Sequence, residues 1–309
     1  MISFDQIQDF VRREGFVAAG ISKPIVADIY TNRLGEWLES GYHADMSWME
    51  RSPGIRSDLQ AHFPWARSVL VVADSYYSET HFSEKSLCFS KYAFGVDYHK
   101  IVTEKLQNIL NSLIKVDRNM MGKIYVDTGP ILEKAFAEQA GLGWIGKNSN
   151  FIVNNVGSFC FLGILILNIA LESSPVVKNR CGNCTKCLDA CPTGAIIKPG
   201  AVDSRKCISY LTIEKKGAFS DREAKLLNNW LYGCDICQEV CPWNKKWSSK
   251  TREIRYLDRI SRLDRSRDEW LKLTAEEFDC LFNNSSLKRL KYERFRRNLM
   301  ALNPKVFFR

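Results

Sequence analysis

The sequence lacks any apolar run long enough to cross a membrane. Its longest run, Cys160–Leu171, is interrupted by Asn168 and covers about half of the roughly 20 residues that a spanning helix needs. The opening residues MISFDQIQDFVRREG contain no apolar stretch of a secretory signal, and Arg12 and Arg13 do not form a twin-arginine signal there. We therefore expect a cytoplasmic protein without membrane contact, and a buried strand at Cys160–Leu171.

The bias typical of disordered chains is absent as well. Hydrophobic residues make up 45% and charged residues 26% of the 309 positions, which predicts a globular chain with two domains or one large domain with an insertion. The net charge of +9 favours a polyanionic partner such as nucleic acid, although charge alone establishes only solubility and non-specific attraction.

Residues 1–175 alternate between helix and strand signals, which predicts an α/β or α+β domain with a central sheet. The first helix opens with a capping box from Ser3 to Gln6 and ends at Gly15. A later helix shows Val102, Leu106, Ile109 and Leu113 on one face, and further helices are expected at Ile25–Ser40 and Ile131–Ala140. Strands are expected at Phe16–Ser22, Ser68–Ala73, 123–129, Phe151–Asn154 and Phe159–Leu171, with a glycine-rich loop at 141–148.

The rest of the chain changes character twice. Residues 176–245 are dense in Cys, Pro and Gly and lose their periodicity, as expected of a small module organised by bound metal. Residues 246–309 are helical in pattern and strongly charged. We therefore expect an α+β domain at 1–175, a ferredoxin-like module at 176–245 and a helical basic segment at 246–309.

Eleven cysteines in a reducing compartment indicate metal or redox chemistry rather than disulfides. The run from Cys181 to Pro192 has the spacing CxxCxxCxxxCP of bacterial ferredoxins, in which the fourth cysteine serves the other cluster. The second run, from Cys234 to Pro242, has three cysteines, and Cys207 can replace the missing first ligand. We assign one four-iron four-sulfur cluster to Cys181, Cys184, Cys187 and Cys241, and a second to Cys191, Cys207, Cys234 and Cys237.

Two structural zinc sites are the alternative, since eight thiolates also make two tetrahedral centres. Zinc ribbons, however, use separated CxxC pairs rather than four thiolates within eleven residues before a proline. The remaining cysteines, Cys88, Cys160 and Cys280, are expected to be mostly buried and inert.

Five motifs together resemble the epoxyqueuosine reductase family, cobalamin-dependent iron–sulfur enzymes that complete the queuosine modification of transfer RNA. The resemblance covers about residues 5–300. We expect the C-terminal helical repeats of longer members to be absent. The motifs are Asp97–Lys100 (DYHK), Val126–Glu133 (VDTGPILE), Ala140–Ser149 (AGLGWIGKNS), Arg205–Glu214 (RKCISYLTIE) and Leu231–Asn244 (LYGCDICQEVCPWN).

The resemblance implies a base-off cobalamin between the N-terminal domain and the cysteine module, with the clusters delivering electrons to cobalt. It implies reduction of the epoxide of epoxyqueuosine at the tRNA wobble position, with an external electron donor, and it places the proton donor on Asp127. A carboxylic acid beside an opening epoxide can supply a proton if burial raises its pKa. Taken alone, the residues favour an aspartate that binds turn amides before Gly129 and Pro130.

The resemblance also predicts cofactor contacts, although GLGWIGKN by itself predicts only a helix C-cap followed by a loop. His99, at a helix start, is expected to be a hydrogen-bonded structural residue rather than a cobalt ligand. The predicted cobalamin-binding residues are Arg56, Asp127, Lys147, Asn148, Ser149 and Ser209.

The C-terminal segment Ser286–Asn298 interleaves six basic residues with Tyr292 and Phe295. Such a helix can neutralise phosphates and stack on bases, and a solvated amphipathic face is the alternative. We predict nucleic-acid contacts from Lys288, Lys291, Arg294 and Arg297.

Three classes of function compete: a tRNA-modifying cobalamin enzyme, a related reductive dehalogenase acting on small molecules, and an electron-transfer protein without a substrate of its own. The dehalogenases usually resemble exported proteins, and an export signal is not seen here. An electron carrier would not need the first 175 residues. The tRNA-modifying enzyme, acting as a monomer, is therefore the predicted function.

Overall fold

A four-stranded antiparallel sheet forms the centre of the N-terminal part of the protein. The computed structural model describes residues 2–51, 53–80 and 82–302. The strand order is β1–β2–β7–β4, and β2 pairs with β7 from Ser68 opposite Leu167 to Ser75 opposite Cys160. The strands are β1 (Ala18–Ser22), β2 (Ser68–Ser75), β4 (Gly122–Tyr125) and β7 (Cys160–Leu167). All of β2 and most of β7 are buried, which explains why both lack the alternating pattern of a half-exposed strand.

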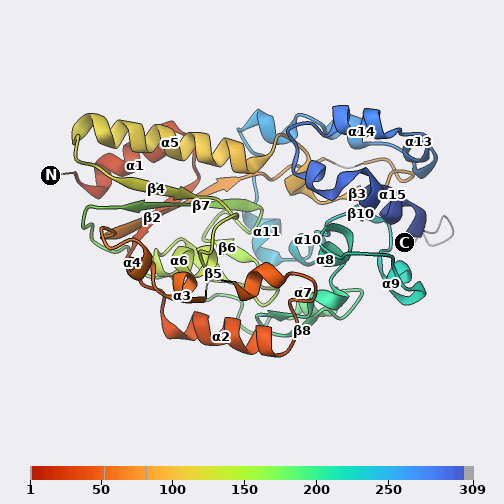
Figure 1. Cartoon of the computed structure of the whole chain (residues 1–309), viewed down its shortest axis with the longest axis horizontal. Helices are drawn as coiled ribbons and strands as arrows, with labels where there is room; N and C mark the ends of the chain where they lie inside the picture. Colours follow the sequence, from red (N-terminus) through yellow and green to blue (C-terminus); the bar gives the residue numbers. More distant parts are fainter. Residues whose placement is uncertain (1, 52, 81, 303–309) are drawn as a thin grey trace.

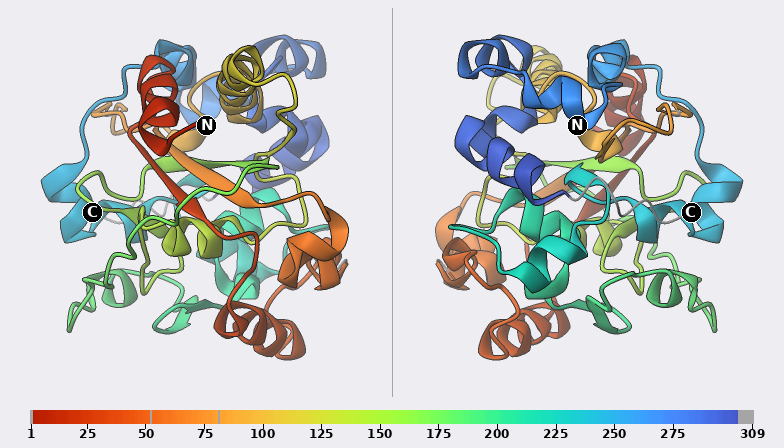
Figure 2. Two further views of the ribbon diagram at one scale, coloured as in Figure 1. Left: turned by 90° about the vertical axis from the view of Figure 1, so that its left-hand side faces the viewer. Right: turned by 90° about the vertical axis from the view of Figure 1, so that its right-hand side faces the viewer.

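Two helices, α1 (Phe4–Arg13) and α5 (Tyr98–Val116), cover one face of this sheet (Figures 1 and 2). The predicted capping box is confirmed, because Ser3 accepts from Gln6 N and the Gln6 side chain accepts from Ser3 N. The four apolar residues predicted for one face of the longer helix are all buried in α5. Periodicity therefore predicted this layer correctly.

The other face is covered by α6 (Glu133–Gln139) and by the hairpin of β5 (Gly143–Ile145) and β6 (Phe151–Val153). The glycine-rich segment was expected to be a loop, and the structure instead forms a strand within it. Gly143 permits this pairing, because a Cβ at that position would lie 1.9 Å from the carbonyl oxygen of Ile152. The neighbouring elements are α2 (Asp28–Glu39), η1 (Ser47–Glu50), α3 (Pro53–Ser57) and α4 (Leu59–His62).

Short elements dominate the cysteine-rich part. Two four-residue helices, α7 (Lys186–Asp189) and α10 (Ile236–Glu239), each begin within a cysteine run and pack against each other. Their proximity brings the two runs together despite about forty intervening residues. The remaining elements here are β8 (Ile196–Lys198), β9 (Ala201–Val202), η3 (Ser204–Lys206), α8 (Ile208–Ile213), α9 (Asp221–Leu226) and α11 (Pro242–Trp247).

The C-terminal helices share one apolar core with parts of both preceding regions. Strand β10 (Trp230–Tyr232) pairs in parallel with β3 (Cys88–Phe89), and the core joins residues 87–94 to Leu211 and Trp270. Residues from all three expected regions thus pack in one core. The domain boundaries expected near residues 175 and 245 stay predictions. The elements not yet named are η2 (Lys91–Ala93), η4 (Ile254–Leu257), α12 (Ile260–Leu263), α13 (Arg267–Leu271), α14 (Ala275–Leu281), η5 (Ser286–Leu290) and α15 (Lys291–Ala301).

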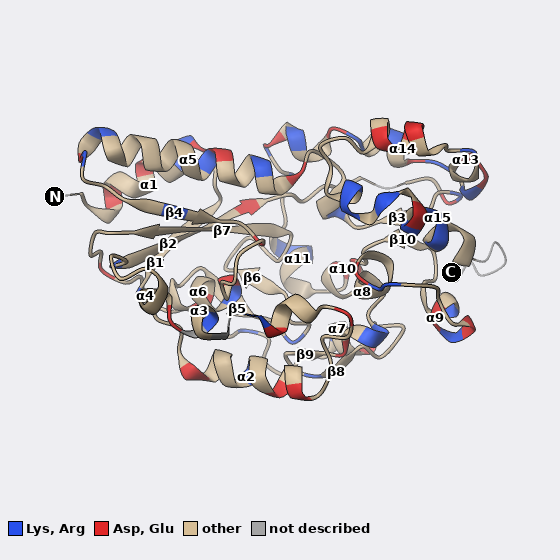
Figure 3. Ribbon diagram, in the orientation of Figure 1, with Lys and Arg blue, Asp and Glu red and all other residues tan. Residues whose placement is uncertain are grey.

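The predicted C-terminal basic helix is not continuous. It divides into the 3₁₀ helix η5 and the α-helix α15, and Lys291 at the junction has φ +59°, in the left-handed region. That conformation is uncommon for a residue with a side chain and changes the direction of the chain. Figure 3 shows Lys and Arg residues gathered along this segment beside β3 and β10. Within the described part of the chain, no helix is both long and apolar enough to cross a membrane.

Candidate active site

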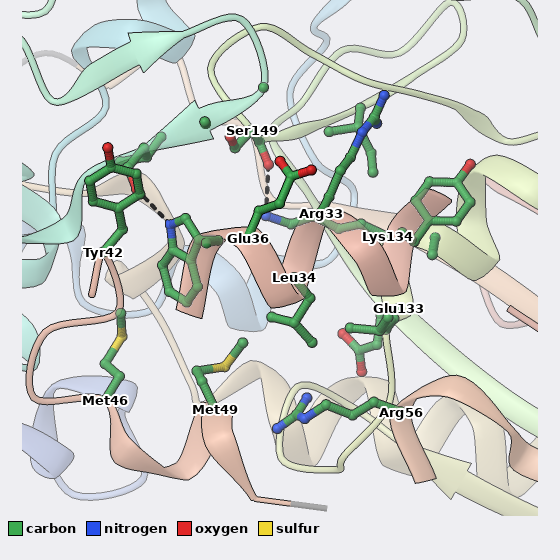
Figure 4. A pocket seen from close by; sticks show the side chains of 18 of the residues that line it. Arg33, Leu34, Glu36, Tyr42, Met46, Met49, Arg56, Glu133, Lys134 and Ser149 are labelled. Carbon is green, nitrogen blue, oxygen red and sulfur yellow. Dashed lines mark hydrogen bonds between the residues drawn. The ribbon is translucent and has the colours of Figure 1, made fainter. Parts of the chain in front are cut away.

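A cavity of about 2100 Å³ opens between α2, the turn after β4 and the loop that carries the first cysteines (Figure 4). This volume exceeds the roughly 300–1,000 Å³ of pockets for drug-sized ligands. Its wall contains four of the predicted catalytic or cofactor-binding residues, Arg56, Asp127, Lys147 and Ser149, and also Cys181. The structure therefore brings the predicted acid to the same space as the cysteine module.

Asp127 lies in the turn that follows β4, in a left-handed conformation with φ +57°. Its backbone N–H donates to Glu133 Oε1 at 2.6 Å, and its side chain is about 53% exposed toward the cavity. Non-glycine residues in this region of backbone space typically cost about 1–3 kcal/mol and concentrate at functional sites. The turn thus presents the carboxylate at the cavity rather than using it to bind the turn amides.

Two neighbouring side chains from the start of α5 hold the Asp127 carboxylate. Tyr98 Oη donates to Asp127 Oδ2 at 2.6 Å, and His99 Nε2 lies 3.4 Å from the same oxygen. The other ring nitrogen of His99 lies 2.6 Å from Asp97 Oδ1, so the imidazole bridges two carboxylates. Asp97 is also the N-cap of α5, since it accepts from His99 N at 3.1 Å.

These contacts determine which group carries a proton. Burial alone would raise the pKa of Asp127, but hydrogen bonds from His99 and Tyr98 lower it below its ordinary value. Burial alone would lower the pKa of His99, but the two carboxylates raise it to about 9. The expected raised pKa of Asp127 is therefore not found, and the proton resides on His99 at neutral pH.

A second acid lies behind Asp127. Burial, followed by the Asp127 charge, raises the pKa of Glu133 to about 8, so this side chain is mostly protonated at pH 7. Next to it, burial lowers the pKa of Lys134, whose Nζ donates to the Ser149 carbonyl at 2.8 Å. Figure 4 shows Lys134 extending toward Ser149 in the cavity. Tyr98, His99 and Glu133 lie in the quoted motifs, but the sequence offered no signal of their role around Asp127.

The cavity contains a buried polar atom that fits a ligand. Ser149 Oγ is buried and has no hydrogen-bond partner among the described residues, although buried hydroxyls are normally paired. Arg56 is also buried, and burial lowers its pKa. A large cofactor rich in amide groups, such as cobalamin, fits this size and this donor set.

Two predicted cofactor contacts lie elsewhere. Asn148 and Ser209 are not among the described residues that line the cavity. Asn148 is buried and donates from Nδ2 to the Cys237 carbonyl at 3.3 Å, so it braces the cysteine module. Lys147 does line the cavity, but its Nζ donates to the Cys184 carbonyl at 3.0 Å.

The cysteines form two groups of electrostatic neighbours. After burial, the charges that most raise the pKa of Cys187 are those of Cys181, Cys241 and Cys184. In the second group, burial and then the charges of Cys237 and Cys207 raise the pKa of Cys234, and Cys191 acts likewise on Cys207. The charge of Cys187 also raises the pKa of Cys237, across the two sets, so the assignment of each cysteine to one cluster stays a prediction.

Hydrogen bonds also reach the thiols. Ala195 N donates to Cys191 Sγ at 3.3 Å, and Asn150 Nδ2 donates to Cys237 Sγ at 3.7 Å. Hydrogen bonds to sulfur are one of the properties that set a cluster's reduction potential. Among the leftover cysteines, Cys280 is exposed, so its expected burial is wrong.

The basic side chains of the C-terminal segment have different partners. Arg294 donates to the carbonyls of Leu290, Ile213 and Arg289, and Arg297 donates to those of Lys215, Gly217 and Leu211. These two arginines hold α15 against the end of α8. Lys288 and Lys291 are exposed.

Two family models match the chain. A 4Fe-4S double cluster binding domain matches residues 180–244, which confirms the two clusters expected from the cysteine spacing. The fold and this module define an iron–sulfur oxidoreductase. The model of epoxyqueuosine reductase QueG matches residues 56–128.

Whole-chain similarity agrees with these models. An epoxyqueuosine reductase of Atelocyanobacterium thalassa is 41% identical over 302 residues, covering 96% of this chain and 98% of the relative. That of Synechocystis sp. is 40% identical over 277 residues, covering 89% and 95%. The chain belongs to the epoxyqueuosine reductase family, which confirms the predicted family.

Solved structures of this family share the fold. The epoxyqueuosine reductase of Bacillus subtilis, with its catalytic aspartate loop swung out of the active site, has a TM-score of 0.89 at 28% identity, covering 96% of this chain and 80% of that one. An epoxyqueuosine reductase with an epoxyqueuosine-modified tRNA stem loop has a TM-score of 0.88 at 28% identity with the same coverage. These likenesses confirm the predicted α+β fold with its double-cluster module.

Proposed function

We propose that this protein reduces the epoxide of epoxyqueuosine in tRNA to the alkene of queuosine. Two electrons and two protons remove the epoxide oxygen as water, so the reaction balances without another product. One observation carries the proposal: the hydrogen-bonded series Asp97, His99 and Asp127 borders a large cavity that the loop of Cys181 also lines. Proton-holding groups and the iron–sulfur module therefore meet at one space.

The proton path follows from the pKa values. His99 is charged at neutral pH because its pKa is about 9, and Asp127 is ionised. When the opening epoxide develops negative charge on oxygen, His99 Nε2 gives its proton to the Asp127 carboxylate, which passes it to that oxygen. Because its own pKa is low, Asp127 loses the proton readily to a strongly basic alkoxide. The hydrogen bond from Tyr98 keeps the carboxylate in place during this transfer.

Bound cobalamin would supply the redox chemistry for cleaving the carbon–oxygen bond, and the clusters would supply it with electrons one at a time from an external donor. We propose that Arg56 and Ser149 hold the cofactor, since both line the cavity, Arg56 is buried and the buried Oγ of Ser149 has no partner among the described residues. Lys147 joins this cavity to the cysteine module through its hydrogen bond to Cys184. Asn148 supports the module from outside the cavity, and Ser209 is not among the described residues that line it.

Two exposed lysines of the predicted tRNA surface are free to meet phosphates. Lys288 and Lys291 lie at the solvent-facing side of η5 and at its junction with α15. We propose that these two contact the tRNA backbone, while Arg294 and Arg297 shape the segment that carries them. A monomer suffices for this arrangement.

The proposal is tested with purified protein that carries both clusters and cobalamin. Epoxyqueuosine-bearing tRNA is incubated anaerobically with this protein and a low-potential reductant. The tRNA is then digested, and its nucleosides are identified by mass spectrometry. We expect queuosine to replace epoxyqueuosine, and no conversion in matched reactions without cobalamin. Unchanged epoxyqueuosine with a fully loaded protein would contradict the proposal.

A further inference from the structure

A second cavity, of about 390 Å³, adjoins the first. Two residues, His99 and Arg289, line both cavities. A ligand in the first cavity can therefore lie close to a ligand in the second. The second cavity lies between the start of α5 and the segment 283–289. Its volume falls within the roughly 300–1,000 Å³ of small-ligand pockets.

The wall of this cavity is cationic. It contains Lys100, Lys288 and Arg289, whereas its carboxylate Asp97 is paired with His99. The Lys288 side chain has no ion-pair or hydrogen-bond partner among residues 2–51, 53–80 and 82–302. Arg289 is partly neutralised by Glu214 at 2.6 Å. The start of the 19-residue helix α5 adds the positive end of its dipole.

The aromatic residues of the wall leave little ring surface for a base. Tyr98 is stacked between His99, at 4.1 Å, and Phe161, at 4.2 Å, so both of its faces are covered. Tyr232 is 1% exposed. Stacking on an aromatic ring is the usual way to hold an unpaired base. Tyr92 is half-buried, with its ring packed against Tyr98 and Tyr232. The cavity therefore offers more cations and polar groups than open ring surface, which suits a phosphate better than a base.

The segment opposite α5 is held in place from behind. Buried Arg259 donates to the carbonyls of Leu281 at 3.1 Å and Asn283 at 2.5 Å. Across the cavity, Asp97 N donates to the Asn284 carbonyl at 2.8 Å, and Lys100 Nζ donates to Asn284 Oδ1 at 2.5 Å. The cationic wall is thus preorganised, which lowers the entropy cost of binding.

We propose that this second cavity binds a backbone phosphate of the nucleotide next to epoxyqueuosine, with Lys288 and Lys100 as its cations. The inference rests on the proposed function, because the epoxide must occupy the adjoining cavity. Holding that phosphate places the modified base at Asp127 through a short covalent tether. Lys288 and Lys100 are positioning residues, since neither reaches the reacting atoms.

A thermodynamic cycle tests this contact. Three epoxyqueuosine-bearing anticodon stem-loops are compared: one with natural phosphates, and two in which the phosphate on either side of the modified nucleotide is a neutral methylphosphonate. Binding to the loaded parent protein and to Lys288→Ala is measured by fluorescence anisotropy. The matched control is Lys115→Ala, which removes an exposed lysine near the other end of α5.

For one of the two positions, we expect the neutral linkage to weaken binding about tenfold in the parent and in Lys115→Ala. In Lys288→Ala the same linkage should change the dissociation constant by less than about twofold, because the charge it would meet is gone. Equal losses in parent and Lys288→Ala at both positions would overturn the assignment. Iron content and thermal midpoint exclude misfolding of the variant.

Turnover of the natural stem-loop by the parent is measured in the same series. If Lys288 and the phosphate are coupled in binding but the epoxide is not reduced, the phosphate site is supported and the proposed function is rejected. If the epoxide is reduced but Lys288 and the phosphate are not coupled, the proposed function is supported and the phosphate site is rejected. Lys100→Gln is measured in the same way, and we expect it also to reduce the effect of the neutral linkage. Its amide can still donate to Asn284.

Discussion

The imidazole of His99 lies 3.4 Å from the carboxylate of Asp127. Because a second carboxylate, Asp97, holds the other ring nitrogen, His99 stays charged up to a pKa of about 9. The site therefore holds its proton on His99, beside the Asp127 carboxylate, and both side chains line the cavity.

His99→Gln is expected to slow epoxide reduction by at least tenfold at pH 7 and to remove the alkaline decline of the rate. In the parent, the raised pKa means that the proton is present below about 9 and lost above it, so the rate falls through that pH. The pH profile of kcat/KM from 6.5 to 10 measures this. Superimposable profiles for parent and variant would remove His99 from the proton path.

The same pairing has a consequence for stability. Since the folded-state pKa of His99 lies above its ordinary value of 6.5, its stabilisation is complete below about pH 6.5 and is lost as pH rises through about 9. Thermal midpoints across this range should decline less in His99→Gln than in the parent.

Glu133→Gln is expected to retain activity at pH 7 within about threefold, because an amide reproduces the protonated acid and still accepts from Asp127 N. The raised pKa of Glu133 gives a stabilisation that is complete below its ordinary value of 4.5 and lost as pH rises through about 8. Above that pH, ionised Glu133 repels Asp127. The variant should therefore keep more activity at pH 9 than the parent, whereas Glu133→Ala, which lacks the acceptor, should lose activity at every pH. A variant profile that falls like the parent's would reject this role.

Replacing Cys191 with Ser should damage the cluster of Cys207, Cys234 and Cys237 rather than that of its sequence neighbours. The prediction follows from the crossed spacing and from the proximity of Cys191 to Cys207. Parent protein should hold about eight irons per chain after anaerobic reconstitution. Electron paramagnetic resonance of each cluster makes the test, and loss of the signal assigned to Cys181, Cys184 and Cys187 would reverse the assignment.

Arg297→Ala is expected to lower the free energy of unfolding by about 1–3 kcal/mol, because it removes the donor from three carbonyls, one of them in buried Leu211. The guanidinium donates to three carbonyls and lies 4.2 Å from the ring of Phe219. The salt dependence of tRNA affinity should stay unchanged, whereas Lys288→Ala should flatten it by roughly 0.7–0.9 of a unit of slope. Denaturant titration and a salt series distinguish the two roles, and a flatter slope in Arg297→Ala would return it to the tRNA surface.

Regular patterns in the sequence predicted their counterparts well. The spacing of Val102, Leu106, Ile109 and Leu113 predicted the buried face of α5, because helical periodicity directly reports which side of a helix is covered. Cysteine spacing likewise predicted the double-cluster module that the family model matches. In each case, the information lies within one short segment.

Features that depend on distant backbone were not predictable. Arg294 and Arg297 had the pattern of a phosphate-binding helix. In the structure their guanidinium groups donate to carbonyls within residues 211–217, and only the fold brings these groups together. The break at Lys291 and the turn at Asp127 both need left-handed backbone. Neither position is a glycine, so the sequence does not indicate this conformation. The low pKa of Asp127 depends on Tyr98 and His99, about thirty residues earlier in the chain.

The measurement that tests the central claim most directly is the single-turnover rate of Asp127→Asn on epoxyqueuosine-bearing tRNA, with iron and cobalamin content matched to the parent. Asparagine tolerates the left-handed backbone and keeps the shape of the side chain, but its amide cannot accept the His99 proton and pass it on. We predict normal cofactor content and a rate lower by about a hundredfold to ten-thousandfold. A rate within about threefold of the parent, far outside that range, would contradict the account.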